Sequence, residues 1–342
     1  MRNKQNQQEN KEMAVSIEDI KKLRTMTGAG MMDCKNALAE TDGNIEAAIE
    51  IIRKKGQAVA AKREDREAAE GCVLSATNGD FAAIVALKCE TDFVAKNESF
   101  RNLTQAILDA ALAAEVKSLD ELKALSLNGR TVEENITDEI GKTGEKMELG
   151  AYECIKAPSV AAYNHLGNKL ATIVGLNLEG IDPSVGREVA MQVAAMNPVA
   201  VDRDHVSNEI IESEKSVAVE KTKEEQVKRA VEVALKKAGL NPNHFDSEDH
   251  INSNLAKGWF TQEDADKARE IIKKTSEEKA ANLPEQMIQN IAQGRLNKFF
   301  KESCLMEQEF HRDAKLTVGE FLDQTQKGLV VVEFKRVNLN QD

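Results

Sequence analysis

The first sixty residues carry hydrophobic positions at helical spacing, separated by glycines and short polar turns. Three helices are predicted, over residues 17–26, 31–40 and 45–56. The first begins at a Ser16-x-x-Asp19 capping box, and the third is expected to stop at Gly56. Because short helices bury only one face each, we expect a small three-helix bundle over residues 13–56. An Ala-, Lys- and Glu-rich linker over 57–70 follows.

The second predicted helix carries two adjacent methionines that cannot share one face. Met31 lines up with Cys34 and Leu38, whereas Met32 lies about 100° farther round the helix. Two interpretations remain open. Either one methionine is buried while the other is offered to a partner, or both fill the core.

From residue 71 onward the hydrophobic spacing changes to that of strands. Two strands are predicted, over 71–77 and 81–89, joined by a hairpin turn at Asn78-Gly79 and followed by a helix. A similar order of strands, turn and helix recurs from residue 147. This repeat predicts an α+β core of two related antiparallel-sheet and helix subdomains. Their expected segments are 71–146 for the first, and 147–203 with 284–342 for the second, whose sheet a strand over 329–337 completes.

Residues 204–283 interrupt the second subdomain with mostly charged helical sequence. The pattern predicts an inserted helical, coiled-coil-like arm, although a solvated surface subdomain fits the same patchy spacing. His244 and His250 lie in the polar loop of this segment. Two histidines alone lack the converging ligands that a metal site needs, so we expect no metal there.

Charge and composition narrow the possible functions. Lys and Arg total 46 against 58 Asp and Glu, a net charge of −12, which argues against a nucleic-acid binder with a basic face. The five cysteines show no Cys-x-x-Cys spacing, so neither a disulfide framework nor structural zinc is expected. Residues 1–12 are almost entirely polar and resemble a disordered extension. With neither a membrane-length apolar run nor a signal peptide in evidence, we expect a cytoplasmic protein.

The most informative segment is the turn within residues 89–97, where an apolar strand runs into a helix. Asp92 and Phe93 lie side by side on this turn. Either Phe93 folds back into the core, as phenylalanine usually does, or it is exposed and a partner protein covers it. The turn alone favours the first interpretation, and the rest of the chain favours the second.

No combination of nucleophile, base and acid is apparent in the sequence. Gly-x-Ser-x-Gly, His-Glu-x-x-His and Walker motifs do not occur, and the five histidines are scattered. We therefore expect a protein-binding module that is not an enzyme and uses no cofactor. Two alternatives remain: an enzyme with Cys89 or Cys154 as a nucleophile, and a helical-bundle interaction adaptor that works through residues 14–56 alone.

Two segments resemble the signatures of a known family. Residues 27–35, Thr-Gly-Ala-Gly-Met-Met-Asp-Cys-Lys, and residues 91–97, Thr-Asp-Phe-Val-Ala-Lys-Asn, are similar in type and order to those of bacterial translation elongation factor Ts. The resemblance covers about 14–206 and 284–337. It implies a guanine nucleotide exchange factor for elongation factor Tu. The implied fold has a ubiquitin-associated-like N-terminal bundle, a core of two subdomains and a coiled-coil arm.

The resemblance also implies roles for individual residues. The turn would intrude beside the magnesium site of the partner and displace the ion through Thr91, Asp92, Phe93 and Val94. The bundle and a hairpin tip would contact the partner through Leu23, Arg24, Met31, Met32 and His165. Elongation factor Tu, GDP-bound or nucleotide-free, is the implied partner, without direct nucleic-acid or membrane contact. The 204–283 segment is longer than the usual arm of the family, and we do not expect, after residue 337, the extra C-terminal helical module that some members carry.

Overall fold

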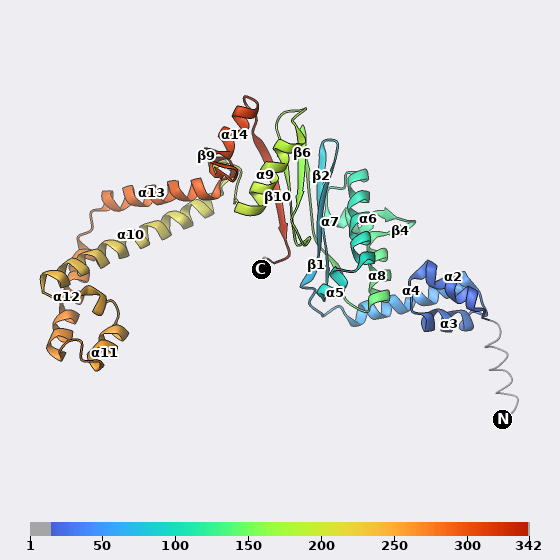
Figure 1. Cartoon of the computed structure of the whole chain (residues 1–342), viewed down its shortest axis with the longest axis horizontal. Helices are drawn as coiled ribbons and strands as arrows, with labels where there is room; N and C mark the ends of the chain where they lie inside the picture. Colours follow the sequence, from blue (N-terminus) through green and yellow to red (C-terminus); the bar gives the residue numbers. More distant parts are fainter. Residues whose placement is uncertain (1–14, 341–342) are drawn as a thin grey trace. The chain divides into compact units, whose positions relative to one another are not determined.

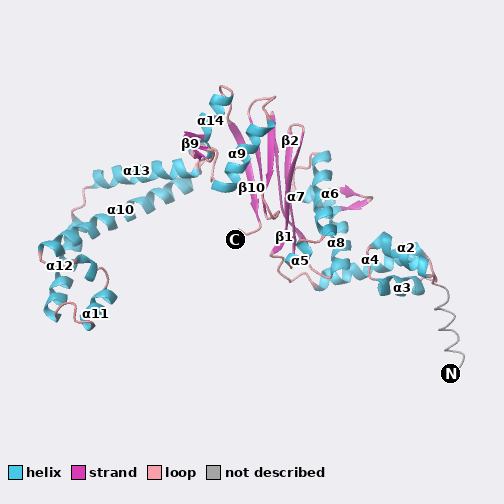
Figure 2. Cartoon of the chain, in the orientation of Figure 1, coloured by secondary structure: helices cyan, strands magenta, loops and turns pink. Residues whose placement is uncertain are grey.

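A computed structural model of the protein describes residues 15–340, so the extension expected over 1–12 lies outside the described residues. The chain divides into two compact units. One comprises the residues up to Asn197 together with those from Phe310 onward, and the other is Pro198–Glu309. Figure 1 follows the chain through its elements, and Figure 2 shows that the main strands gather in the first unit. This mixture of helices and small antiparallel sheets agrees with the predicted α+β class.

Three helices form the N-terminal bundle: α2 (Ile17–Thr27), α3 (Met31–Glu40) and α4 (Ile45–Lys62). The side chains of Ser16 and Asn44 cap α2 and α4 by accepting backbone N–H groups. The buried core of the bundle consists of Ile20, Leu23, Ala29, Cys34, Ala37, Leu38 and Ala48. The predicted stop at Gly56 is wrong, because α4 continues through this buried glycine to Lys62.

The first sheet has three antiparallel strands in the order β1-β2-β5. They are β1 (Glu70–Asn78), β2 (Phe81–Cys89) and β5 (Met147–Lys156). Between β2 and β5 the chain forms α5 (Asp92–Ala95), α6 (Glu98–Ala114), α7 (Leu119–Ala124), β3 (Ser126–Leu127), β4 (Arg130–Thr131) and α8 (Val132–Thr143). Helix α6 packs against β1 and β2 through a face that includes Phe100 and Ile107. The sequence repeat placed 147–156 in the second subdomain, but this strand pairs with β2, a choice that hydrophobic spacing alone does not determine.

The second sheet has the order β10-β7-β6 and is also antiparallel. Its strands are β6 (Ser159–Asn164), β7 (Leu170–Leu176) and β10 (Val331–Asn338), with α9 (Pro183–Met196) packed on β6 and β7. The first unit also contains β9 (Asp313–Thr317) and α14 (Val318–Thr325), and β8 (Glu309–Phe310) lies at the boundary. The expectation that the last strand completes this sheet is confirmed, because β10 pairs along the length of β7.

The second unit is a helical arm. Its elements are η1 (Arg203–His205), α10 (Asn208–Lys237), η2 (Pro242–His244), α11 (Glu248–Ala256), α12 (Gln262–Ala281), α13 (Glu285–Ser303) and η3 (Leu305–Glu307). Helix α10 packs against both α12 and α13. The predicted arm, 204–283, ended before α13, whereas the compact unit includes this helix. The difference arises because Leu296 and Phe300 of α13 share a core with Val206 at the start of the arm.

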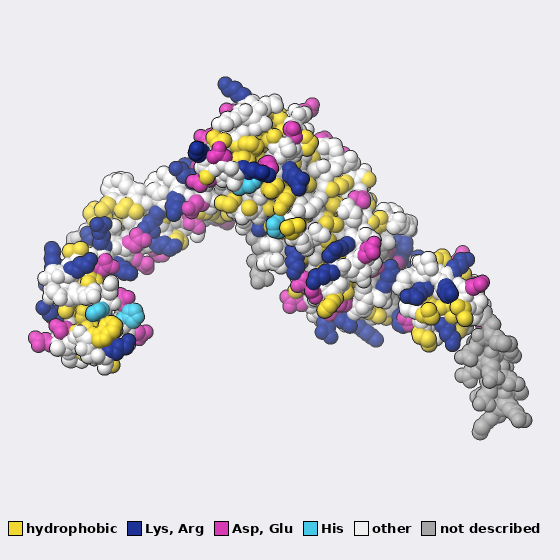
Figure 3. Space-filling view, viewed as in Figure 1, with side chains coloured by type: hydrophobic (Ala, Val, Ile, Leu, Met, Phe, Trp, Pro, Cys, Tyr) yellow, Lys and Arg dark blue, Asp and Glu magenta, His cyan; other side chains and the backbone are white. Residues whose placement is uncertain are grey.

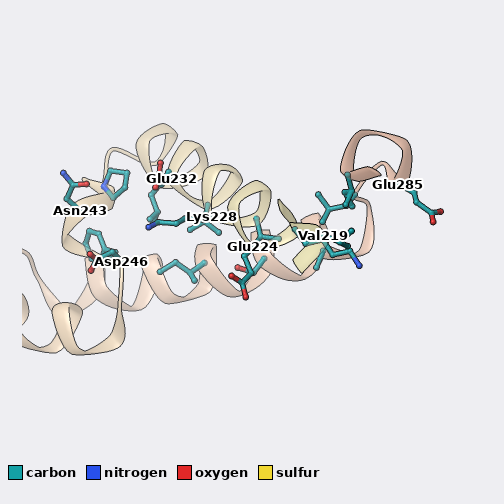
Figure 4. A pocket seen from close by; sticks show the side chains of 18 of the residues that line it. Val219, Glu224, Lys228, Glu232, Asn243, Asp246 and Glu285 are labelled. Carbon is teal, nitrogen blue, oxygen red and sulfur yellow. The ribbon is translucent and has the colours of Figure 1, made fainter. Parts of the chain in front are cut away.

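The arm contains a cavity of about 820 Å³ among α10, α12 and α13 (Figure 4). Its hydrophobic lining includes Val219, Val227, Val231, Leu235, Phe245, Ile272, Leu283 and Ile288. Glu224, Lys228 and Glu232 of α10 also line it. Figure 3 shows side chains of both charge signs interspersed over the surface of the arm. The side chains that line this cavity lack packing contacts on the side that faces it.

Candidate functional site: an exposed turn and a neighbouring hairpin

Phe93 lies almost fully in solvent, with 83% of its surface exposed. It occupies α5, a single helical turn that follows β2 directly. Val94 and Ala95 anchor the turn by packing against the core of the first sheet, so Phe93 points outward while its neighbours point inward. Of the two sequence interpretations, the structure supports the exposed one. An exposed aromatic side chain on an anchored turn is a typical contact residue for another protein.

The polar groups of Thr91 are all engaged, which fixes the start of this turn. Its N–H donates to Glu145 Oε2 at 3.1 Å, and its hydroxyl donates to Glu145 Oε1 at 2.7 Å. The same hydroxyl accepts the N–H of Val94 at 3.4 Å, and the Thr91 carbonyl accepts the N–H of Ala95 at 3.1 Å. Thr91 is thus an N-cap that is itself held by a carboxylate from a distant loop.

Asp92 is paired with Lys96 one helical turn later. The carboxylate and the ammonium group lie 2.6 Å apart, and this hydrogen bond holds the pKa of Asp92 below its usual range. Asp92 is therefore ionised at neutral pH and about half exposed. It places a negative charge directly beside the exposed ring of Phe93, where it would repel a phosphate and attract a cation.

A second exposed tip lies at the β6–β7 hairpin. Leu166 is 91% exposed, and the neighbouring His165 is also exposed, with its ring nitrogen Nδ1 3.0 Å from the hydroxyl of Tyr163. A small cavity of about 40 Å³ is lined jointly by Asp92 from the turn and Lys169 from the hairpin. The two tips therefore belong to one surface of the first unit. Leu166 was not predicted as a site residue, although its position beside His165 at a hairpin tip was a usable signal.

Hydrogen bonds between the two sheets hold these tips together. Asn164 accepts the N–H of Ser75 at 2.7 Å and donates its side-chain amide to the Ser75 carbonyl at 2.8 Å. The N–H of Val73 donates to the carbonyl of Asn168 at 2.7 Å. Because β1 thus bonds directly to the hairpin, its tip cannot move far from the first sheet without breaking buried or half-buried hydrogen bonds.

The bundle offers a hydrophobic surface of its own. Met26, Met31 and Met32 are 57%, 52% and 64% exposed, and Arg24 is also exposed. Neither interpretation of the methionine pair is correct, because both side chains face solvent. Met31 lies in the first turn of α3, one turn before the buried Cys34, where the bundle no longer covers it. The expected contact through Leu23 is also wrong, since this side chain is fully buried in the bundle core.

Neither of the two cysteines considered as nucleophiles lies in surroundings that favour its thiolate form. Burial raises the pKa of Cys89 to about 12 and also raises the pKa of Cys154, so neither thiol is readily ionised. Among residues 15–340, no group of three or more His, Cys, Asp or Glu is arranged to hold a metal ion. His250 pairs with Asp246, and His244 lies against Trp259 and Phe260. Within the same described range, no helix combines the length and apolarity that crossing a membrane requires.

Comparison with a family model and with curated relatives identifies the same family in each case. The family model described as elongation factor TS matches residues 90–238 and 228–341. Among curated relatives, Elongation factor Ts of Bacteroides thetaiotaomicron is 59% identical over 331 residues, 96% of this chain and 100% of the relative. That of Porphyromonas gingivalis is 49% identical over the same shares, and that of Azobacteroides pseudotrichonymphae is 40% identical over 330 residues. These matches confirm the resemblance to the family, and the chain belongs to the elongation factor Ts family.

Proposed function

We propose that this chain is a guanine nucleotide exchange factor for elongation factor Tu in translation elongation, and therefore a cytoplasmic protein. It binds the partner in its GDP-bound state, and the 91–94 turn enters beside the bound magnesium ion and displaces it. Without the ion, the partner would hold GDP less tightly and release it. Nothing in this scheme needs a covalent step, a cofactor of the chain itself, or contact with nucleic acid or membrane.

The observation that carries this proposal is the exposed Phe93 on an anchored turn, with the ionised Asp92 beside it. A hydrophobic ring can fill a pocket in the partner, while the neighbouring carboxylate perturbs a nearby bound cation electrostatically. The exposed His165 and Leu166 lie on the same surface and give the partner a second contact beside the turn.

Thermodynamic linkage explains how binding becomes exchange. A turn that fits only the magnesium-free site must weaken GDP binding by the factor by which GDP weakens binding of the turn. Every tenfold weakening requires about 1.4 kcal/mol of differential binding. A buried aromatic anchor supplies roughly 2–4 kcal/mol, so Phe93 alone accounts for at most about a thousandfold effect.

Additional contacts must therefore hold the chain on its partner during exchange. The exposed Arg24, Met31 and Met32 of the bundle are suited to this task, because methionine side chains adapt to hydrophobic surfaces of irregular shape. These contacts would strengthen binding in every nucleotide state. The turn would contribute the part of the binding free energy that favours the partner without magnesium and GDP.

Stopped-flow release of a fluorescent GDP from elongation factor Tu tests the proposal. The wild-type chain is compared with the double variant Asp92→Ala/Phe93→Ala, and binding of each to nucleotide-free partner is measured in parallel. We expect strong acceleration by the wild-type chain and loss of most of it in the double variant, while binding persists. Trp259→Ala is a matched control, since it removes another exposed aromatic side chain, 59% exposed, in the other compact unit.

The possible outcomes separate function from mechanism. Equal acceleration by wild type and double variant would retain the exchange function and reject the role of the turn. Failure of the wild-type chain to accelerate GDP release would reject the exchange function. Binding by residues 14–56 alone, without exchange, would then favour the adaptor alternative, for which the exposed methionines of the bundle provide a surface.

A further inference from the structure

Two dipeptides, Glu90-Thr91 and Glu145-Lys146, are cross-linked by reciprocal hydrogen bonds. The Glu145 carboxylate accepts the backbone N–H of Thr91 at 3.1 Å, and the Glu90 carboxylate accepts the backbone N–H of Lys146 at 2.7 Å. Each acid thus binds the main chain of the other segment, and we call this arrangement the reciprocal lock. It connects the 91–94 turn to the loop between α8 and β5.

Further contacts strengthen both halves of the lock. On one side, the Thr91 hydroxyl adds a 2.7 Å hydrogen bond to Glu145, so this carboxylate binds Thr91 through both of its oxygens. On the other side, Arg63 at the end of α4 lies 3.1 Å from each oxygen of Glu90. Hydrogen bonds that involve a charged partner are stronger than neutral ones, and two-point contacts also fix direction.

We propose that Glu145 is a positioning residue for the exposed turn, holding Thr91 so that Asp92 and Phe93 are presented in one fixed orientation. The inference rests on the proposed exchange function and adds a residue outside the exposed surface to it. Without Glu145, Thr91 would lose both of its bonds to the α8–β5 loop. The four-residue helix α5 would keep its internal bonds, the anchors Val94 and Ala95, and the hydrogen bond that the Ala95 carbonyl accepts from Arg101 Nε at 3.3 Å.

A positioning role predicts a specific kinetic pattern. A mobile turn still allows the bundle and the hairpin to dock, so the concentration of chain giving half-maximal exchange should change little. The maximal rate of GDP release should fall, because displacements of about 1 Å at a reacting centre are enough to cost up to about a hundredfold. We expect Glu145→Ala to lower the maximal rate about tenfold and to shift the half-maximal concentration by less than about threefold.

Conservative variants sharpen the test. In Glu145→Gln, the amide oxygen can still accept the Thr91 N–H while its NH₂ group donates to the Thr91 hydroxyl, so we expect a maximal rate within about threefold of wild type. Glu145→Asp keeps the charge but shortens the side chain by one carbon and should behave like Glu145→Ala. If Glu145→Ala does not fold, the comparison of Gln with Asp decides the question. Glu179→Ala, which removes an exposed acid, is the matched control and should equal wild type.

The full-length chain is used throughout, with stopped-flow GDP release and amide hydrogen exchange as the two measurements. The Thr91 amide should lose protection in Glu145→Ala and Glu145→Asp while amides of β2 keep theirs. Maximal rates of Glu145→Ala and Glu145→Asp equal to wild type would overturn the inference while leaving the exchange function intact. If the wild-type chain itself fails to accelerate release, the proposed function fails and the inference fails with it.

Discussion

Gly56 of α4 and Gly141 of α8 face each other where the two helices cross. A Cβ atom added to Gly141 would lie 2.8 Å from the Cα atom of Gly56, whereas one added to Gly56 would have no contact shorter than 3.5 Å. The crossing therefore has room for a methyl group on Gly56 but no room for one on Gly141. It is the place where the last helix of the bundle rests on the first subdomain. Along the chain, Gly56 comes shortly before Arg63, and Gly141 comes shortly before Glu145 of the reciprocal lock.

This asymmetry predicts opposite effects of one chemical change. Gly56→Ala should stabilise the chain by about 0.5–1 kcal/mol, since alanine favours a helix and its methyl group finds room. Gly141→Ala should be less stable than Gly56→Ala by at least about 1 kcal/mol, because its methyl group meets backbone. Urea unfolding of both variants measures the difference, and equal free energies would show that the helices separate without cost.

Phe93 and Leu23 should differ in their effect on stability, although the family resemblance implies contact with the partner for both. Phe93→Ala should change the free energy of unfolding by no more than about 0.5 kcal/mol, since its side chain is 83% exposed. Leu23→Ala should cost about 2–5 kcal/mol by leaving a cavity in the bundle. Denaturant titration tests both. A strongly destabilised Phe93→Ala would mean that the ring is buried after all.

The raised pKa values of the thiols predict low reactivity of the folded chain. With a pKa of about 12, Cys89 carries almost no thiolate at pH 8, and Cys34, Cys72 and Cys304 are buried. Iodoacetamide at pH 8 should therefore label Cys154 first and slowly, with the other four protected until the chain unfolds. Peptide mass spectrometry identifies the labelled positions. Rapid labelling of Cys89 would revive the thiol-enzyme alternative.

The Glu90 half of the reciprocal lock should make stability depend on pH. The N–H of Lys146, with the guanidinium of Arg63, holds the pKa of Glu90 below its usual range. A depressed pKa in the folded state gives stability that is complete above about pH 4.3, the value in an unfolded chain, and lost as the pH falls through the folded value.

Replacement of this acid tests the dependence. Glu90→Gln should lower the free energy of unfolding by about 1 kcal/mol at pH 7, because a charged acceptor is replaced by a neutral one. The difference between Glu90→Gln and wild type should shrink as the pH approaches 3. Urea midpoints measured from pH 7 to pH 3 give the answer, and a constant difference would place the effect outside the titration of this carboxylate.

Local sequence signals predicted the elements well. Ser16 caps the start of α2 as expected, and the Asn78-Gly79 turn joins β1 to β2. These features depend on residues within a few positions of each other. The exposure of Phe93 could be given only as one of two alternatives. Whether a side chain is buried depends on distant parts of the chain, and the neighbouring residues do not determine it.

The contacts that support the site were not predictable in this way. Glu145 lies 54 positions from Thr91, and Arg63 lies 27 positions from Glu90. Nothing in the residues around Glu145 marks it, because an acid after a helix is ordinary. Leu23 illustrates the converse error: a segment associated with partner binding also contains residues that only build the bundle core.

Because the arm lies between β7 and β10 in the sequence, these two strands of the second sheet are synthesised at different times. Strand β7 leaves the ribosome roughly 150 residues before its partner β10, and at about 5–20 residues per second this delay lasts on the order of 8–30 s. Throughout that interval, the edge of β7 opposite β6 has none of its final hydrogen-bond partners. Such an unpaired edge can pair with another chain. During synthesis, the second subdomain is therefore the part of this protein most exposed to misassembly.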